Sequence, residues 1–327
     1  MLVKAIFRAN LQFGNARSYE QAMKMYDHKV EQLYKGEVCI KPEMMAFDEV
    51  NLSMSIPNLV VTTLEKTIKN TAFLLENIAQ YAMAGRGYVW ILDNGRATFS
   101  CYIEPTESKT VIQSFLKGKQ LAKEAGHEAE AIEVLSDVIS KFARHWTAFE
   151  RRGYVHGLIG NFEQAVNDFD ASIAINEHQA DAYFSRARVK MMQGKIEEAI
   201  PDFDTTWKNA NPQLPIYWSA RRVKAECCMK MGRYVEAAQE LKFFTKQNFT
   251  VENSNYPWRK DAWLNYSYSL AKAGDTDKEA KEAFLMVNQI TDCLEPIMDE
   301  KMTAFYEKMT ALIASDKPSK RNKKVTV

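Results

Sequence analysis

The sequence has no long apolar run and almost no net charge, and these absences exclude several classes of protein. No stretch reaches the roughly 18 uncharged apolar residues that a membrane-spanning helix needs. The first residues, MLVKAIFRANLQFG, are interrupted by Lys4 and Arg8 and lead to no small-residue cleavage site, which is unlike a secretory signal. The formal net charge is +1, so no overall field favours nucleic acid or an anionic membrane.

Cysteine is also scarce. The five cysteines are odd in number and have no paired spacing, and Cys227 and Cys228 are adjacent, which disfavours a disulfide between them. This usage is typical of a reducing compartment, so we expect a cytoplasmic protein without a disulfide framework. The adjacent pair is expected to be buried as small hydrophobic side chains.

The spacings that carry catalysis or cofactor binding are missing as well. No Gly-rich phosphate loop stands between a strand and a helix, and the five histidines have no metal-ligand spacing and are expected at solvated or turn positions. Asp168 with Asp170, and Asp202 with Asp204, lie two residues apart on predicted helices, so the members of each pair point in different directions and cannot share a proton. We expect these aspartates on a solvated helix face, and we expect no catalytic residue, no cofactor and no metal.

What the second half of the sequence does have is an internal repeat. Glycine is followed five residues later by alanine, a bulky apolar residue stands four residues after the alanine, and the first three glycines are 34 residues apart. The glycines and alanines are Gly126/Ala131, Gly160/Ala165, Gly194/Ala199, Gly232/Ala237 and, with one extra residue, Gly274/Ala280. The bulky residues are Leu135, Phe169, Phe203, Leu241 and Phe284.

This spacing predicts helical hairpins that stack on one another. The glycine can adopt a left-handed turn between two helices, the alanine allows the helices to approach, and the bulky residue one turn later fills the space between hairpins. A hairpin of this kind cannot bury its apolar face alone, so several copies stack into a solenoid.

The repeat resembles the tetratricopeptide repeat family over roughly residues 110–290, in the order aromatic residue, small residue, glycine turn, Ala-x-x-x-Phe. The small residue of the first helix is Gly153, Ala187 or Ala225, but Lys119 in the first copy. The resemblance implies a right-handed α-solenoid of about five hairpins whose first helices line a concave groove for a peptide or protein partner. The predicted groove residues are Tyr154, Phe184, Arg188, Arg222, Glu226 and Tyr268.

In residues 1–105 the spacing of apolar residues differs from that of the repeats, and it predicts a small α+β domain with an antiparallel sheet and two helices in the order β-α-β-β-α-β-β. The strands are expected in VKAIFRA, EVCI, FDEVNLSMSI and on both sides of Asn94-Gly95, which predicts a tight hairpin turn. SYEQAMKMYDHKVEQLYKG and LVVTTLEKTIKNTAFLLENIAQYAMAG are expected to form helices. The order is compatible with a ferredoxin-like core plus one strand.

The predicted solenoid occupies residues 110–314 and ends in a capping helix, and residues 315–327 are expected to be a disordered basic tail. The chain as a whole therefore predicts a mainly α fold that begins with a small α+β domain.

The function expected from this architecture is non-enzymatic binding of a peptide or protein partner, in the manner of an adaptor, an assembly factor or a chaperone. One alternative is an enzyme with its active site in the N-terminal domain near Asp48, Glu49 or Arg86. Another is a nucleic-acid binder that uses the basic tail and the arginines of the first helices, namely Arg151, Arg152, Arg186, Arg188, Arg221 and Arg222. A third is self-association through an exposed edge strand of the N-terminal sheet.

Overall fold

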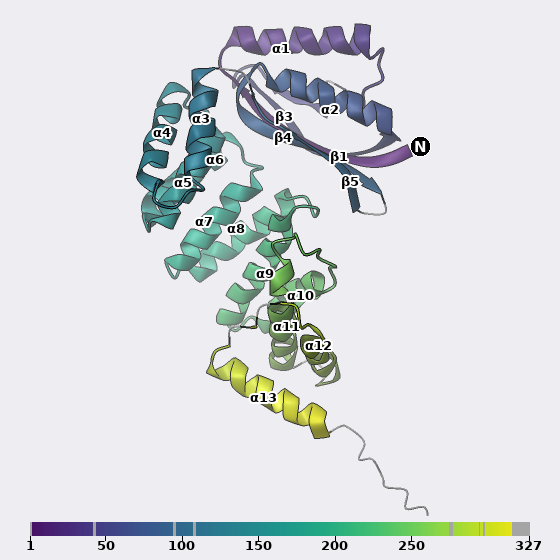
Figure 1. The fold of residues 1–327 in the computed structure, drawn as a ribbon, viewed down its shortest axis with the longest axis vertical. Helices are drawn as coiled ribbons and strands as arrows, with labels where there is room; N and C mark the ends of the chain where they lie inside the picture. The colour runs from purple at the N-terminus through teal and green to yellow at the C-terminus, as the bar shows by residue number, and fades with distance from the viewer. Residues whose placement is uncertain are drawn as a thin grey trace, which may run out of the picture. The chain divides into compact units, whose positions relative to one another are not determined.

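The structure is a computed structural model that describes residues 2–41, 44–93, 96–106, 109–274, 277–293, 295–296 and 298–315 (Figure 1). The predicted turn at Asn94-Gly95 and the basic tail from residue 316 lie outside the described residues. The chain divides into two compact units, which are described separately: residues 1–195 with 208–213 form unit 1, and residues 196–207 with 214–327 form unit 2. The domain limits predicted from the sequence stay a prediction.

Unit 1 begins with a five-stranded antiparallel sheet of strand order β2-β3-β1-β4-β5. Helices α1 (Ala16–His28), which continues as a short π-helix (Lys29–Leu33), and α2 (Glu65–Ala79) cover one of its faces (Figure 1). The strands are β1 (Leu2–Phe13), β2 (Ala46–Asp48), β3 (Ser53–Leu64), β4 (Ala82–Asp93) and β5 (Arg96–Ile103). β1 lies between β3 and β4, antiparallel to both, which is the ferredoxin-like arrangement with β5 added beside β4.

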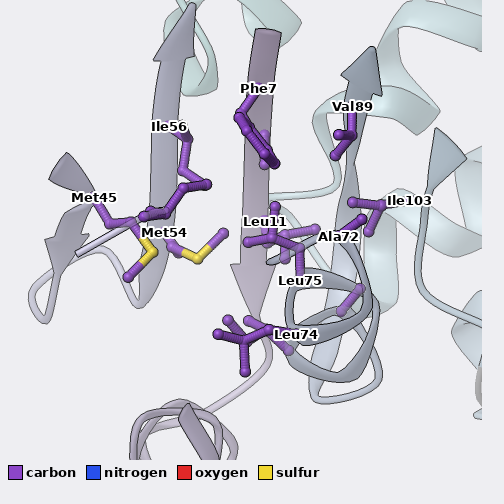
Figure 2. Packing of buried hydrophobic residues seen from close by; sticks show 14 of the residues in the cluster. Phe7, Leu11, Met45, Met54, Ile56, Ala72, Leu74, Leu75, Val89 and Ile103 are labelled. Carbon is purple, nitrogen blue, oxygen red and sulfur yellow. The ribbon is translucent and has the colours of Figure 1, made fainter. Parts of the chain in front are cut away.

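The core of this domain lies between the sheet and the two helices. Alternate side chains of β1, among them Phe7 and Leu11, are fully buried, and they pack with Met54 and Ile56 of β3 and with Leu75 of α2 (Figure 2). Because side chains alternate along a strand, the even-numbered residues of β1 face the opposite side of the sheet.

Four elements differ from the sequence prediction. The second helix ends earlier than predicted, because α2 stops at Ala79 and AMAG (residues 82–85) forms the start of β4. EVCI (residues 37–40) is not a strand, because its backbone is bound to helix side chains: the Cys39 N–H donates to Thr71 Oγ1 at 3.0 Å, and the Ile40 carbonyl accepts from the Tyr26 hydroxyl at 2.9 Å. LVVTTL (residues 59–64) is not helical but the end of β3, since its β-branched side chains suit a strand better than a helix. FDEVNLSMSI forms the β2–β3 hairpin instead of one strand.

The helices after the sheet follow the predicted order of five pairs and a final helix. They are α3 (Thr110–Leu121), α4 (Glu128–Lys141), α5 (Trp146–Leu158), α6 (Phe162–Ile175), α7 (Ala180–Met192), α8 (Ile196–Asn209), α9 (Pro215–Lys230), α10 (Tyr234–Thr245), α11 (Arg259–Ala273), α12 (Asp277–Gln289) and α13 (Glu300–Ser315). α3 to α7 belong to unit 1, whereas most of α8 and all of α9 to α13 belong to unit 2. Within each unit, successive helices pack side by side.

The glycine and alanine positions of the repeat do what their spacing predicts. All five turn glycines have a left-handed backbone, with φ between 75° and 89°, and nothing lies within 4 Å of an added Cβ, so the backbone conformation alone demands glycine. The alanines and the bulky residues of the repeat are all buried. In the first copy, however, the small residue at the close helix approach is Gly118 and not Lys119, since a Cβ on Gly118 would lie 2.8 Å from Leu135.

A basic residue recurs at Arg152, Arg186 and Lys224 and binds acceptors on second helices, and Arg152 and Lys224 each link the second helices of two neighbouring pairs. In unit 1, Arg152 of α5 donates to both carboxylate oxygens of Asp168 in α6, at 2.9 and 2.7 Å, and to the Ser136 hydroxyl of α4 at 2.9 Å. Arg186 of α7 donates to Asp170 of α6.

Unit 2 repeats this arrangement at Lys224 of α9. Its ammonium donates to Asp204 of α8 at 2.6 Å and to Glu240 of α10 at 2.9 Å. The solvated helix face predicted for the paired aspartates is therefore wrong for Asp168 and Asp202, which are both 5% exposed. We call the contacts of Arg152, Arg186 and Lys224 the basic ladder.

The C-terminal helix covers the last pair of unit 2, as the capping role predicts. Met302 and Met309 of α13 are buried in one cluster with Leu264 of α11 and Phe284 of α12. The ring of Phe305 stands edge-on to Phe284, with 6.2 Å between the centroids. None of the helices in the described ranges is both long and apolar enough to cross a membrane.

Candidate partner-binding surfaces

In unit 1, the second face of the sheet packs against the connections between helix pairs. Arg86 of β4 pairs with Asp181 in the first turn of α7, and its guanidinium lies 5.1 Å from the ring centroid of Trp146 at the start of α5. Arg144, between α4 and α5, donates to Gln12 of β1 at 3.1 Å. The sheet and the first helices are thus joined by buried polar contacts, and we call the Arg86–Asp181 pair the sheet anchor.

The three residues considered for an enzyme site in the N-terminal domain do not come together. Asp48 lies in the β2–β3 turn and accepts hydrogen bonds from the backbone N–H and the amide of Asn51, whereas Arg86 lies on the far face of the sheet. A cavity near Gly85 and His145 holds only about 10 Å³, enough for a single water molecule. Across the described ranges, no group of acidic, His and Cys side chains is arranged to hold a metal ion.

His145 was expected at a solvated or turn position; it lies in the connection between α4 and α5 and is buried there, with 1% of its surface exposed. Its Nδ1 accepts the backbone N–H of Ala148 at 3.2 Å and so caps α5, while the ring lies 4.5 Å from the centroid of Phe115. Burial lowers the pKa of His145 to about 3, which keeps the ring neutral. A position just before a predicted helix could have indicated this capping role.

The predicted groove residues of unit 1 lie on two adjacent first helices, α5 and α7. The two helices approach closely where a Cβ on Gly157 would lie 3.3 Å from Val189. Tyr154 stands one turn before Gly157 and is half-buried against the apolar side chains of α3 and α4. Arg188 is exposed next to Val189, and its guanidinium lies 6.0 Å from the ring centroid of Phe184, one turn earlier on the same helix.

The predicted groove residues of unit 2 behave differently. Arg222 is 8% exposed, pairs with Glu226 one turn later on α9 and lies 4.1 Å from the ring centroid of Trp258. Asp261 of α11, which sequence reasoning missed, lies near this pair and accepts a hydrogen bond from Asn265 at 2.9 Å. The structure therefore brings Arg222, Glu226 and Asp261 together in one charged cluster, in which Arg222 is already paired with Glu226.

Tyr268 is not part of that cluster. It is 5% exposed, and its ring stands edge-on to Tyr234 and Phe305 at centroid distances of 5.8 and 5.2 Å. The residue packs α11 against α10 and α13. Its position in the chain matched the groove position of the earlier repeats, but the capping helix covers it.

Asp261 should make the stability of unit 2 depend on pH. Burial, and to a lesser extent Glu226, raises its pKa to about 6 from an ordinary 3.8, while Arg222 lowers it. The folded state thus binds the proton more tightly than the unfolded state, so stability falls as the pH rises from about 4 to 6. Asp261→Asn is expected to raise the free energy of unfolding at pH 8 by about 3 kcal/mol, on a scale of about 1.4 kcal/mol per pKa unit.

Urea titrations of the wild type and Asp261→Asn at pH 4.5 and pH 8 check this prediction. The gain in the free energy of unfolding should be clearly larger at pH 8 than at pH 4.5. Asp292→Asn is the matched control, because Asp292 is an exposed carboxyl whose pKa is lowered by the Tyr256 hydroxyl, and it should show no such gain. An equal effect of Asp261→Asn at pH 4.5 and pH 8 would mean that the pKa of the Asp261 carboxyl is not raised in the folded protein.

Most of the arginines proposed for nucleic-acid binding are bound to carboxylates. Arg152 and Arg186 belong to the basic ladder, and Arg222 pairs with Glu226. Arg221 pairs with Glu240 at 2.6 Å and lies over the ring of Trp207. Like these four, Arg188 lies beside an aromatic ring, that of Phe184, but it differs from them because its side chain is exposed.

Comparison with known proteins identifies the repeats. The family model of the tetratricopeptide repeat matches residues 159–215 and 184–242. No curated protein matches the chain. Similar solved structures include YrrB, described as a TPR protein with an unusual peptide-binding site, at 15% identity over 62% of this chain and 100% of that chain, with a TM-score of 0.46.

Two further structures have the same level of similarity. MamA from Desulfovibrio magneticus RS-1 is 14% identical over 56% of this chain and 96% of that chain, with a TM-score of 0.45. A putative kinesin light chain repeat protein from Podosopora anserina is 17% identical over 55% of this chain and 93% of that chain, with a TM-score of 0.43.

Proposed function

Residues 159–242 of this chain are tetratricopeptide repeats, and from this premise we propose that the protein is a protein-interaction module that binds a peptide or protein partner. We place the contact on the first helices α5 and α7 of unit 1, at Tyr154, Phe184 and Arg188. An adaptor, an assembly factor and a chaperone would all use such a surface. The cytoplasmic location expected from the cysteines stays a prediction.

The observation that carries this proposal is the exposed guanidinium of Arg188 over the ring of Phe184. An arginine that is held against an aromatic ring keeps its donors available and loses less freedom on binding than a free side chain does. Tyrosine, phenylalanine and arginine are also the residue types that dominate binding energy in protein interfaces. We therefore expect the partner to present an acidic group to Arg188 and an apolar side chain to Phe184 and Tyr154.

The triple variant Tyr154→Ala/Phe184→Ala/Arg188→Ala tests the proposal. It is expected to weaken partner binding at least tenfold, because each anchor side chain typically contributes more than about 1 kcal/mol. The measurement is quantitative recovery of the partners that the wild type retains, followed by titration of the purified partner.

A matched triple variant on α6, Glu163→Ala/Gln164→Ala/Asn167→Ala, replaces three exposed residues of the second helix and should bind as the wild type does. If both triple variants recover the same partners at the same strength, the first helices of unit 1 are not the binding surface.

A further inference from the structure

The outer edge of β3 is open over most of its length. β2 pairs only through Ala46–Asp48 with Ser53–Ser55, at the start of β3. Beyond this point, from Ile56 to Leu64, the outer edge of β3 pairs with no other strand within the ranges that the structure describes. Unpaired N–H and C=O groups along a strand are a template for another strand.

The protection that natural proteins give to edge strands is confined here to the start of the open segment, where Pro57 stands at a register shift between Ile56 and Leu59. The sequence of β3, SMSIPNLVVTTL, contains no charged residue, and Pro57 interrupts it only near its middle. Val60 is 52% exposed and Leu64 is 51% exposed, and both lie on the sheet face opposite α1 and α2. Leu2 of β1, which is paired with Leu64, is 66% exposed, so the open edge adjoins an exposed apolar surface.

The opposite edge of the sheet is better protected. β5 is flanked by charged side chains: the Lys69 ammonium lies 6.0 Å from the ring centroid of Phe99, and the Lys119 ammonium lies 5.6 Å from that of Tyr102. Cys101 of β5 donates to the carboxylate of Glu76 at 3.0 Å. Of the two sheet edges in the described ranges, only that of β3 combines open backbone groups with a strand sequence that has no charged residue, and Lys4 of β1 is the charged residue paired with it, opposite Thr62.

We propose that Asn58–Leu64 pairs in antiparallel fashion with the same segment of a second copy of the chain, so that two five-stranded sheets join into one. This inference does not rest on the proposed function of the repeats. A two-fold axis at Val61 would place Val61 opposite its own copy and Val60 opposite Thr62 of the second copy. Pairs of β-branched residues are favourable across antiparallel strands.

The uncharged sequence of Asn58–Leu64 favours a second copy of the chain as the strand that binds this edge. A segment that pairs with itself places Val60 opposite Thr62 of the second copy, so a single charge at either position would face an uncharged group and the same charge at both positions would face a like charge. The uncharged sequence avoids this repulsion and gives no preference for a charged partner strand. A two-fold contact also closes the assembly at two chains.

The first test is the mass in solution, measured by sedimentation over a range of concentrations. The wild type should approach twice the chain mass of 37.5 kDa. Val60→Glu/Thr62→Glu should weaken the dimer at least tenfold, because glutamates then face each other twice across the axis. Within one chain, Thr62 is paired with Lys4, so a glutamate there is tolerated by the monomer fold.

A charge-swapped variant tests the register. Val60→Lys/Thr62→Glu places a lysine opposite a glutamate twice and should restore the dimer, with circular dichroism confirming that all variants are folded. Ser100→Glu on the exposed surface of β5 is the control and should leave the dimer unchanged. A wild type that stays a monomer at all concentrations, a dimer that survives Val60→Glu/Thr62→Glu, or one that is lost with Ser100→Glu would each overturn the proposal.

Discussion

Asp181→Ala is expected to lower the free energy of unfolding of unit 1 by about 3 kcal/mol, because it leaves the Arg86 guanidinium buried without its carboxylate. Only 11% of the Arg86 side chain is exposed, whereas 40% of the Asp181 side chain is exposed. The penalty therefore comes mainly from the arginine that stays behind. Urea denaturation followed by the fluorescence of Trp90 and Trp146, both in unit 1, measures it.

The double variant Arg86→Met/Asp181→Ala separates the charge effect from other losses. Methionine keeps much of the apolar stem of the arginine against Trp146 and removes the unpaired charge, so the double variant should be more stable than Asp181→Ala alone. If the double variant is less stable than the single one, the buried charge is not the source of the penalty.

Phe169→Ala is expected to cost about 4 kcal/mol, since it removes a fully buried ring from the contact between helices. A Cβ on Gly153 of α5 would lie 3.0 Å from this ring, so the helices already touch and cannot move closer to fill the space. The large cost should appear as a lower urea midpoint with little change in slope.

Leu158→Ala is the matched control for Phe169→Ala in the same unit. Leu158 is 57% exposed, so its truncation should change stability by no more than about 0.5 kcal/mol. Similar costs for the two variants would mean that the repeat residue is not a packing residue.

The parts of the fold that sequence could predict are those that depend on one local requirement repeated many times. Each turn glycine needs a left-handed backbone, and each alanine needs close helix contact, so the same residue types return at a fixed spacing. The element order of the N-terminal domain was also predictable, although Gly85, which the sequence suggested as the end of the second helix, lies inside β4. LVVTTL was wrongly assigned to the helix because this strand runs directly into α2, without a glycine or proline between them.

The candidate sites were less predictable, because they depend on which helix covers which. Tyr268 occupies a groove position by its place in the repeat, yet α13 lies over it. Asp261 was missed because its partners Arg222 and Glu226 come from another helix pair, and the sequence between the pairs varies in length. The basic ladder, by contrast, was readable in principle: Arg152 and Asp168 are 16 residues apart, as are Lys224 and Glu240.

The basic ladder has a consequence for how such a chain can lengthen. Two of its basic residues each bind one acceptor in their own helix pair and one in the preceding pair: Arg152 binds Asp168 and Ser136, and Lys224 binds Glu240 and Asp204. A duplicated copy of one repeat would therefore arrive with one donor and two acceptors and would leave no buried carboxylate without a partner at either junction. Growth by tandem duplication therefore keeps each basic residue beside its acceptors, whereas a cut within a repeat would separate a charged side chain from its partner.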